Sequence, residues 1–190
     1  YGDLTVEALE VAATRAANPL PNGRPRLWID RSFSIVGTGT VVTGTLLGAA
    51  LEVGMTVDLW PAEGGVGANA ARIRSLESHE TRMDKVEPHR RVAASLVGVE
   101  RGQTSRGSML GMPGEWQPTR RFLATLRHPR HVDGIGPRNA LQLHVGSGAW
   151  PVRARVLGEN ALLCELTTEL CLQVGDRFIL RDTGRRAPGR

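Results

Sequence analysis

Glycines and threonines gather in residues 36–45, VGTGTVVTGT, where a phosphate-binding loop is a natural first hypothesis. Gly39 and Gly44 have the spacing of the G-x-x-x-x-G-K-[ST] loop, but Thr45 stands where the lysine that reaches the terminal phosphates is required. The dinucleotide-binding fingerprint needs a third glycine three residues after Gly39, and Val42 occupies that position. Neither nucleotide loop is therefore predicted.

The same stretch has the composition of a β-strand. The four residues between the glycines, 40–43, are all β-branched, and such side chains favour the pleated conformation. Glycines inside a strand mark bulges, tight bends or close backbone approach, and bends of this kind let a small sheet close into a barrel. We therefore predict that this stretch forms barrel wall.

Side chains that carry catalysis or hold metals are sparse. Cys164 and Cys171 are the only cysteines, which favours free buried thiols in a reducing compartment over a disulfide framework or a metal site. Ser32 and Ser34 lack the G-x-S-x-G turn, and no Asp/His partners can be chosen for them from spacing. We predict no catalytic residue, no metal site and no bound cofactor in this chain.

The charge balance points modestly towards nucleic acid. The 190 residues carry 24 Lys+Arg against 19 Asp+Glu, a net charge of +5, and Lys85 is the only lysine. Arginine suits bidentate phosphate contacts, although an arginine-rich surface can also be simply solvated.

No run of about eighteen apolar residues and no signal-peptide pattern is present, so we expect a cytoplasmic protein without a membrane partner.

The pattern along the chain predicts an all-β protein. Residues 4–17 have helical spacing of apolar side chains, and the proline-rich stretch that follows resembles a linker. From residue 26 onward, short apolar runs alternate with glycine-bearing turns about every ten residues. We therefore predict two tandem small β-barrels, 26–115 and 116–190, preceded by a short α-helix and linker in 1–25.

Each predicted barrel contains the pattern L-x-V-G-x-x-x-x-L, at residues 51–59 and 172–180. The glycine permits a turn with positive φ before the next strand. Two related barrels in tandem would explain the repeat, and so would a hairpin solution that recurs in unrelated sheets.

Two longer segments resemble a known family, the translational GTPases. Residues 33–59, FSIVGTGTVVTGTLLGAALEVGMTVDL, are similar to the second-domain barrel of these factors, and residues 90–110, RRVAASLVGVERGQTSRGSML, to its later strands. WIDRSF at 28–33 and the arginine at position 91 resemble the selenocysteine-specific elongation factors (SelB), because EF-Tu usually carries an acidic pair and an asparagine there. LQLHVGS, PVRARV and VGDRFILRD extend the resemblance to the third-domain barrel.

The resemblance implies an aminoacyl pocket made by Asp30, Arg31 and Arg91. A selenol is more acidic than a thiol and is anionic at neutral pH, whereas the competing serine hydroxyl is neutral. Two guanidiniums, which remain charged, could discriminate between them electrostatically. Asp30 would either orient a guanidinium or receive the aminoacyl ammonium. Without the resemblance, these residues would be an exposed strand pair and an exposed turn arginine.

The resemblance also implies that the second barrel contacts the tRNA backbone, for which Arg121, Arg153 and Arg155 are the candidates. Residues i and i+2 of a strand share one face, so Arg153 and Arg155 are expected to point the same way. A solvated face is the alternative for each arginine, because phosphate contacts are non-specific.

The function that the resemblance implies is delivery of selenocysteyl-tRNA to the ribosome at recoded stop codons. In such a factor the helix at 4–17 would end a GTPase domain that holds GTP and Mg, and later domains would bind the recoding mRNA element; both ends of this chain are expected to be cut. Two alternatives remain at this stage. One is a fragment of a general translational GTPase of the EF-Tu or initiation-factor type, and the other is a barrel that serves as a protein-interaction module.

Overall fold

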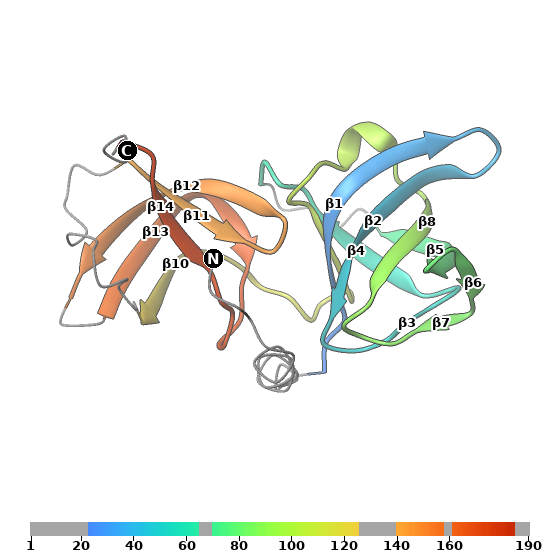
Figure 1. Cartoon of the computed structure of the whole chain (residues 1–190), viewed down its shortest axis with the longest axis horizontal. Helices are drawn as coiled ribbons and strands as arrows, with labels where there is room; N and C mark the ends of the chain where they lie inside the picture. The colour runs from blue at the N-terminus through green and yellow to red at the C-terminus, as the bar shows by residue number, and fades with distance from the viewer. Residues whose placement is uncertain (1–22, 65–69, 126–139, 158–160, 185–190) are drawn as a thin grey trace, which may run out of the picture.

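The computed structural model describes residues 23–64, 70–125, 140–157 and 161–184. The predicted helix at 4–17 lies outside the described residues. What is described is all-β, with one short 3-10 helix, η1 (Arg101–Gln103). The predicted fold class is confirmed, and Figure 1 shows the strands in two groups joined by the segment before β10 (Pro118–Thr125). Within the described ranges, no helix has the length and apolar character needed to span a bilayer.

The first group of strands closes on itself. Its sheet runs in the order β4-β9-β1-β2-β8-β5-β6, and an additional pairing of β4 with β5 closes six of these strands into a barrel. A separate two-stranded sheet is formed by β3 and β7. The bounds are β1 Arg26–Ile35, β2 Gly39–Leu47, β3 Leu51–Glu52, β4 Thr56–Trp60, β5 Ala71–Ser78, β6 Thr81–Met83, β7 Lys85–Val86, β8 Arg91–Val97 and β9 Met109–Gly111.

The barrel interior is filled by alternate side chains of these strands. β5, with the sequence ARIRSLES, buries Ala71, Ile73 and Leu76 and exposes the arginines between them. The core continues through fully or almost fully buried aliphatic side chains of the other strands, including Leu27, Ile29, Val42, Leu46, Leu59, Val92 and Leu110. The expected wall at residues 36–45 is thus confirmed as the β1–β2 hairpin and the start of β2.

The second group forms a five-stranded antiparallel sheet in the order β10-β13-β12-β11-β14. The bounds of its remaining strands are β11 Leu141–Val145, β12 Gly148–Val156, β13 Ala161–Cys171 and β14 Ile179–Asp182. Phe122 on β10 and Phe178 just before β14 meet edge to face, with ring centroids 5.9 Å apart, so side chains bring the two outer strands together. Cys164 and Cys171 are buried in this core as free thiols, as predicted.

Tryptophans fill the boundary between the two groups of strands. Trp28 of β1 and Trp150 of β12 are both almost completely buried, with ring centroids 6.1 Å apart. The indole Nε1 of Trp150 donates to the carbonyl of Ala62 at 2.7 Å. Trp28 and Trp116 both belong to the core cluster of the second sheet, so that core reaches across to β1. The division of domains at residues 115 and 116 stays a prediction.

A buried ion pair lies at the same boundary. Arg26, at the start of β1, donates two hydrogen bonds to Asp176, which precedes β14, at 2.7 and 2.5 Å. The two side chains are only 3% and 8% exposed. The guanidinium also stacks over Trp116 and Trp28, 4.9 and 5.5 Å from the ring centroids. This cluster, which we call the Arg26–Asp176 clasp, ties β1 to the second sheet.

The repeated L-x-V-G pattern has the predicted backbone. Gly54 lies between β3 and β4 with φ 90°, and Gly175 lies before β14 with φ 94°. Each glycine therefore takes the left-handed region that residues with a side chain rarely occupy. The repeat therefore marks the same kind of turn, with a glycine at positive φ, in both groups of strands.

Candidate functional site

The candidate site is built on a β-bulge in β1. The pairing of β1 with β2 is continuous except between Ile29 and Arg31, so Asp30 is an extra residue without a partner of its own. Bulges bend the strand and re-aim a side chain. Gly44 lies opposite this point, and a Cβ there would be 2.0 Å from the carbonyl oxygen of Trp28. Close backbone approach thus explains a glycine in the middle of β2.

Asp30 and Arg91 form a two-pronged ion pair on the outside of the barrel. The Nη1 and Nη2 groups of Arg91, the first residue of β8, donate to the two carboxylate oxygens of Asp30 at 2.5 and 2.9 Å. Thr43 on β2 lies between them: its hydroxyl donates to Asp30 at 2.8 Å and accepts from Arg91 at 3.3 Å. Three adjacent strands therefore each supply one member of the cluster.

The contacts within this cluster shift the pKa values of Asp30 and Arg91. Burial, the largest single influence, raises the pKa of Asp30, but hydrogen bonds from Arg91 and Thr43 and the charges of Arg91 and Arg31 together outweigh it, so the pKa falls below its usual 3.8. The hydrogen bond to Asp30 raises the pKa of Arg91. Both groups are therefore charged at neutral pH, and the pair remains a fixed, charged feature of the surface.

Arg31 is the third predicted pocket residue. It is exposed, lies next to Asp30 in β1, and is opposite Thr43 in the register of β1 and β2. Its charge acts on Asp30, although no direct contact joins the two side chains among the described residues. The structure thus places Asp30, Arg31 and Arg91 on one patch of the barrel surface; their role stays a prediction.

Sequence reasoning missed two further residues of this patch. Thr43 bridges the ion pair, and Glu77 of β5 lies beyond it, because Thr43 pairs with Ala93 of β8 and Ala93 pairs with Glu77. A threonine in a strand is too common to signal a role. The only available cue is that Thr43 precedes Gly44, the glycine that faces the bulge.

The three predicted RNA-contacting arginines share the solvent face of the second sheet. Arg121 of β10 and Arg153 of β12 flank Glu165 of β13 in the same cross-strand row, and the Nε of Arg121 is 4.0 Å from that carboxylate. Arg155 lies opposite Leu163 in the next row. Arg153 and Arg155 are both exposed, as the strand alternation predicts. Contact with RNA stays a prediction for all three.

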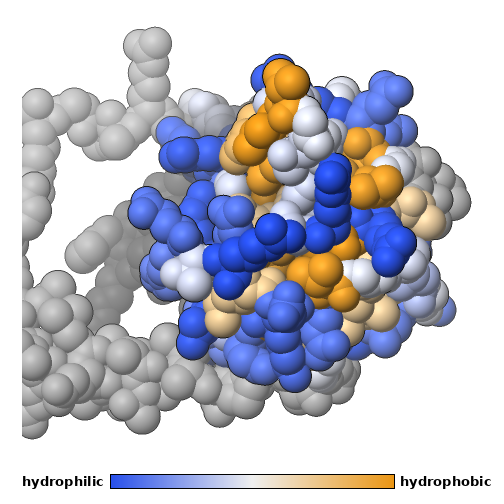
Figure 2. All heavy atoms as spheres, turned by 90° about the vertical axis from the view of Figure 1, so that its right-hand side faces the viewer, coloured by the Kyte–Doolittle hydropathy of each residue, from blue (hydrophilic) through white to orange (hydrophobic). Residues whose placement is uncertain are grey.

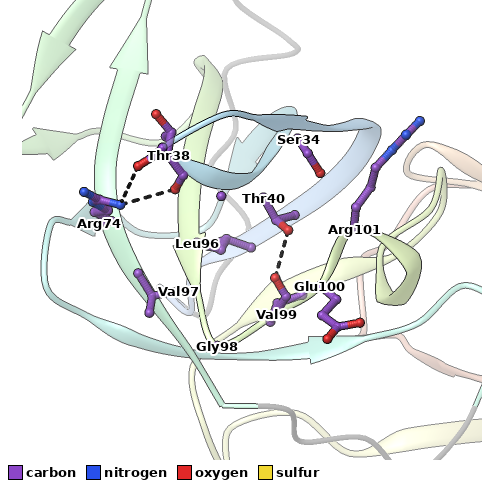
Figure 3. Close-up of a pocket in the computed structure, with 12 residues that line it drawn as sticks. Ser34, Thr38, Thr40, Arg74, Leu96, Val97, Gly98, Val99, Glu100 and Arg101 are labelled. Carbon is purple, nitrogen blue, oxygen red and sulfur yellow. Dashed lines mark hydrogen bonds between the residues drawn. The ribbon is translucent and has the colours of Figure 1, made fainter.

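A cavity separate from this patch lies at one end of the barrel, beside the β1–β2 hairpin (Figure 3). It is an open cavity of about 570 Å³. The hydroxyl of Thr40 is already bonded to the carbonyl of Val99 at 2.8 Å, and Arg74 reaches the carbonyls of Gly37 and Thr38 at 3.3 and 3.4 Å. Figure 3 shows Arg101 on the opposite side of the cavity from Arg74, so the two cations do not converge on one ligand position.

Apolar side chains stand out on this end of the molecule. Figure 2 shows them among mostly hydrophilic surface, and the β1–β2 hairpin contributes Phe33, Ile35 and Val36, of which Val36 is fully exposed. Val97 of β8 is also half-exposed, and it directly follows Leu96, which pairs with Thr40 of β2.

The described residues offer no metal centre: none of their His, Cys, Asp and Glu side chains form a group of three that could hold an ion. Burial raises the pKa of Cys164 to about 11 and that of Cys171 to about 12, so neither thiol is a nucleophile at neutral pH.

Known proteins with similar sequences are translation factors. The elongation factor 1-alpha of Pyrobaculum calidifontis is 31% identical over 150 residues, which cover 76% of this chain and 32% of the relative. The selenocysteine-specific elongation factor of Escherichia coli is 32% identical over 165 residues, which cover 85% of this chain and 25% of the relative. The resemblance to the translational GTPases is confirmed. No family model matches the chain.

Solved structures agree on the fold. The crystal structure of a bacterial selenocysteine-specific elongation factor, EF-Sec, superposes with a TM-score of 0.77 at 21% identity, covering 96% of this chain and 30% of that one. SelB from Methanococcus maripaludis in its apo form gives 0.69 at 20% identity, covering 92% and 42%. The chain thus corresponds to a barrel segment of an elongation factor and spans between a quarter and a third of the two curated relatives named above.

Proposed function

We propose that these barrels carry an aminoacyl-tRNA within a cytoplasmic translation elongation factor that takes it to the ribosome, and that the patch at Asp30, Arg31 and Arg91 selects selenocysteine. The observation that carries the proposal is the Asp30–Arg91 pair at the β1 bulge. It holds a guanidinium in a fixed direction on an otherwise accessible surface, because the Arg91 side chain is still 53% exposed. The similarity to selenocysteine-specific factors supports the same assignment.

The donors of Arg91 fit this role. A guanidinium has five N–H donors in a rigid fork. Asp30 and Thr43 use three of them, which leaves one on Nη1 and the Nε–H for a ligand. A selenolate could therefore be bound without breaking the ion pair. A charged acceptor forms a stronger bond to these donors than the neutral hydroxyl of serine does.

The rest of the reaction belongs to parts that this chain would not supply. In the proposed factor, GTP and Mg are held by a separate GTPase domain, the recoding mRNA element is bound by further domains, and this segment contributes no catalytic residue. The outer face of the second sheet, with Arg121, Arg153 and Arg155, would hold the tRNA backbone. Phosphate contacts of that kind are electrostatic and sequence-independent.

The deciding experiment compares the affinity of the full-length, GTP-loaded factor for selenocysteyl-tRNA and for the same tRNA carrying serine. We expect a preference of about tenfold or more, roughly 1.4 kcal/mol. Arg91→Ala should abolish most of that preference and leave GTP binding intact. Lys85→Ala is the matched control: Lys85 lies on β7 in the same group of strands, is 52% exposed, and pairs with Glu52 and Glu87 at 3.5 and 3.4 Å. Equal affinities in the unaltered protein would refute selenocysteine selection.

That negative result would favour a general aminoacyl-tRNA carrier, which the similarity to elongation factor 1-alpha supports as the second candidate function.

The proposed RNA contacts are tested in a separate experiment. With Arg153 and Arg155 both changed to Ala, the slope of log affinity against log salt should fall by about 1–2, since each phosphate contact contributes about 0.7–0.9. An unchanged slope would remove these arginines from the interface.

A further inference from the structure

The backbone next to Asp30 is held both from the first barrel and from the second sheet. The carbonyl oxygen of Ile29, a residue with no exposed surface, accepts one hydrogen bond from the Gly107 N–H at 2.9 Å and a second from the Ser147 hydroxyl at 2.6 Å. The N–H of Ile29 donates to the Ser108 carbonyl at 2.8 Å. Gly107 and Ser108 belong to the first barrel, whereas Ser147 lies in the turn between β11 and β12 of the second sheet.

The turn that carries Ser147 is itself fixed. The Ser147 carbonyl accepts a hydrogen bond from the Nε of Arg106 at 2.8 Å, so the residue is held through both its hydroxyl and its backbone. Gly146 precedes it with φ 57°, and a Cβ at Gly146 would lie 2.2 Å from the Trp28 ring. Ser147 is thus pressed against β1 and has little freedom to point its hydroxyl elsewhere.

We propose that Ser147 is a positioning residue for the Asp30–Arg91 pair: by bonding to the Ile29 carbonyl it fixes the bulge that aims Asp30 at Arg91. The inference rests on the proposed function only for the consequence in aminoacyl binding. At the bulge the pairing of β1 with β2 skips Asp30, so the ladder alone does not set its direction. The second sheet therefore contributes to the geometry of a site that lies on the first barrel.

The charged surroundings of Asp30 make this geometry measurable. Its carboxylate is affected by burial, by hydrogen bonds from Arg91 and Thr43, and by the charges of Arg91 and Arg31, and the last four of these influences lower its pKa. If the bulge relaxes, the hydrogen bonds lengthen first because they are the most sensitive to direction. The pKa of Asp30 should then move up towards its ordinary value.

The first test is a pH titration of Asp30 in this 190-residue chain, in which carbon-13 NMR of the side-chain carboxylates monitors the protonation of Asp30. Ser147→Ala should raise the pKa of Asp30, while Ser147→Thr, which keeps the hydroxyl, should leave it unchanged. Thr183→Ala is the control, because Thr183 also donates its hydroxyl to a backbone carbonyl, that of Ala140, at 2.8 Å but away from β1. If Asp30 titrates in Ser147→Ala as it does in the unaltered chain, the proposal is wrong.

The second test measures the preference for selenocysteyl-tRNA over seryl-tRNA in the full-length, GTP-loaded factor. Ser147→Ala should reduce the preference by about two- to tenfold, the effect of losing one hydrogen bond, and Ser147→Thr should restore it. A preference that is unchanged in Ser147→Ala overturns the positioning role. Absence of any preference in the unaltered factor would instead reject the proposed function, and the Asp30 titration would still decide whether Ser147 positions the pair.

Discussion

The Arg26–Asp176 clasp should be the most costly single ion pair to break among those described. Asp176→Ala would leave a guanidinium that is 3% exposed without either of its two charged hydrogen bonds. Among the described residues the Nε of Arg26 has no hydrogen-bond partner either, so none of them replaces the lost bonds. Removing one partner of a buried pair typically costs about 3–5 kcal/mol. The stacking on Trp28 and Trp116 is retained, and we therefore expect about 3 kcal/mol.

Urea unfolding followed by tryptophan fluorescence measures this cost. Trp28 and Trp116 flank the clasp and report directly on the boundary between the two groups of strands. With a slope of about 2 kcal/mol per molar urea, a loss of about 3 kcal/mol lowers the midpoint by about 1.5 M. Lys85→Ala provides the contrast, because it removes two exposed ion pairs, to Glu52 and Glu87, and exposed pairs contribute little to stability.

The reasoning is refuted if Asp176→Ala costs less than about 1 kcal/mol, the range of an exposed pair. A second variant separates loss of the pair from loss of packing. Arg26→Met combined with Asp176→Leu removes both charges and keeps apolar bulk, and such replacements are often neutral or stabilising. It should therefore be more stable than Asp176→Ala alone. A double variant that is less stable would mean that the clasp acts mainly through its shape.

Three further predictions concern the barrel wall, the thiols and low pH. Gly44→Ala should destabilise the fold by about 1–3 kcal/mol in urea unfolding, because the new Cβ would lie 2.0 Å from a carbonyl oxygen of β1. Cys164 and Cys171 should resist a thiol reagent at pH 8 until the chain unfolds, since burial raises their pKa values to about 11 and 12. The lowered pKa of Asp30 stabilises the fold above pH 3.8, and this contribution is lost as the pH falls through the folded value. The stability difference between the unaltered chain and Arg91→Ala should therefore shrink below pH 3.8.

For each of these three predictions, a specific result would contradict the reasoning. Gly102→Ala, where a Cβ would meet nothing within 4 Å, is the control for Gly44→Ala, and equal effects of the two changes would disprove the crowding argument. Rapid labelling of the folded chain would show that the thiols are accessible. A difference between the unaltered chain and Arg91→Ala that stays constant from pH 7 to pH 3 would mean that Asp30 does not contribute through its charge.

Long strands could be predicted from the sequence because their signal is local. From residue 26 onward the sequence predicts short strands about every ten residues, and β1 (Arg26–Ile35) and β5 (Ala71–Ser78) are two of them. Alternation of apolar and polar residues over eight or more positions is enough for this. The strands of two or three residues are too short to show such an alternation of apolar and polar residues. β9, for example, exists only because it fits between β1 and β4, and nothing in its three residues indicates that.

The candidate site could be predicted only in part, for the same reason. Asp30 and Arg91 are 61 residues apart, and no spacing rule links them; their choice came from the resemblance to the translational GTPases. That they form an ion pair depends on the bulge, whose position follows from the pairing of two whole strands. Ser147 gave no signal at all, because a serine between two glycines is ordinary turn composition.

Under the proposed function, the charges of the patch predict which arginine discriminates selenocysteine from serine. Within the set formed by Asp30, Arg31 and Arg91, the carboxylate neutralises one of the two cations, which leaves these three residues with a net charge of about +1 at neutral pH. Arg91 is the paired cation. Among the described residues, no carboxylate forms a salt bridge with Arg31, so its charge is the uncompensated one. Arg91 supplies direction and Arg31 supplies net charge, and a selenolate differs from a serine hydroxyl chiefly in charge. Arg31→Ala should therefore reduce the preference for selenocysteine at least as much as Arg91→Ala, whereas a smaller effect would place the discrimination in the directed donors of Arg91.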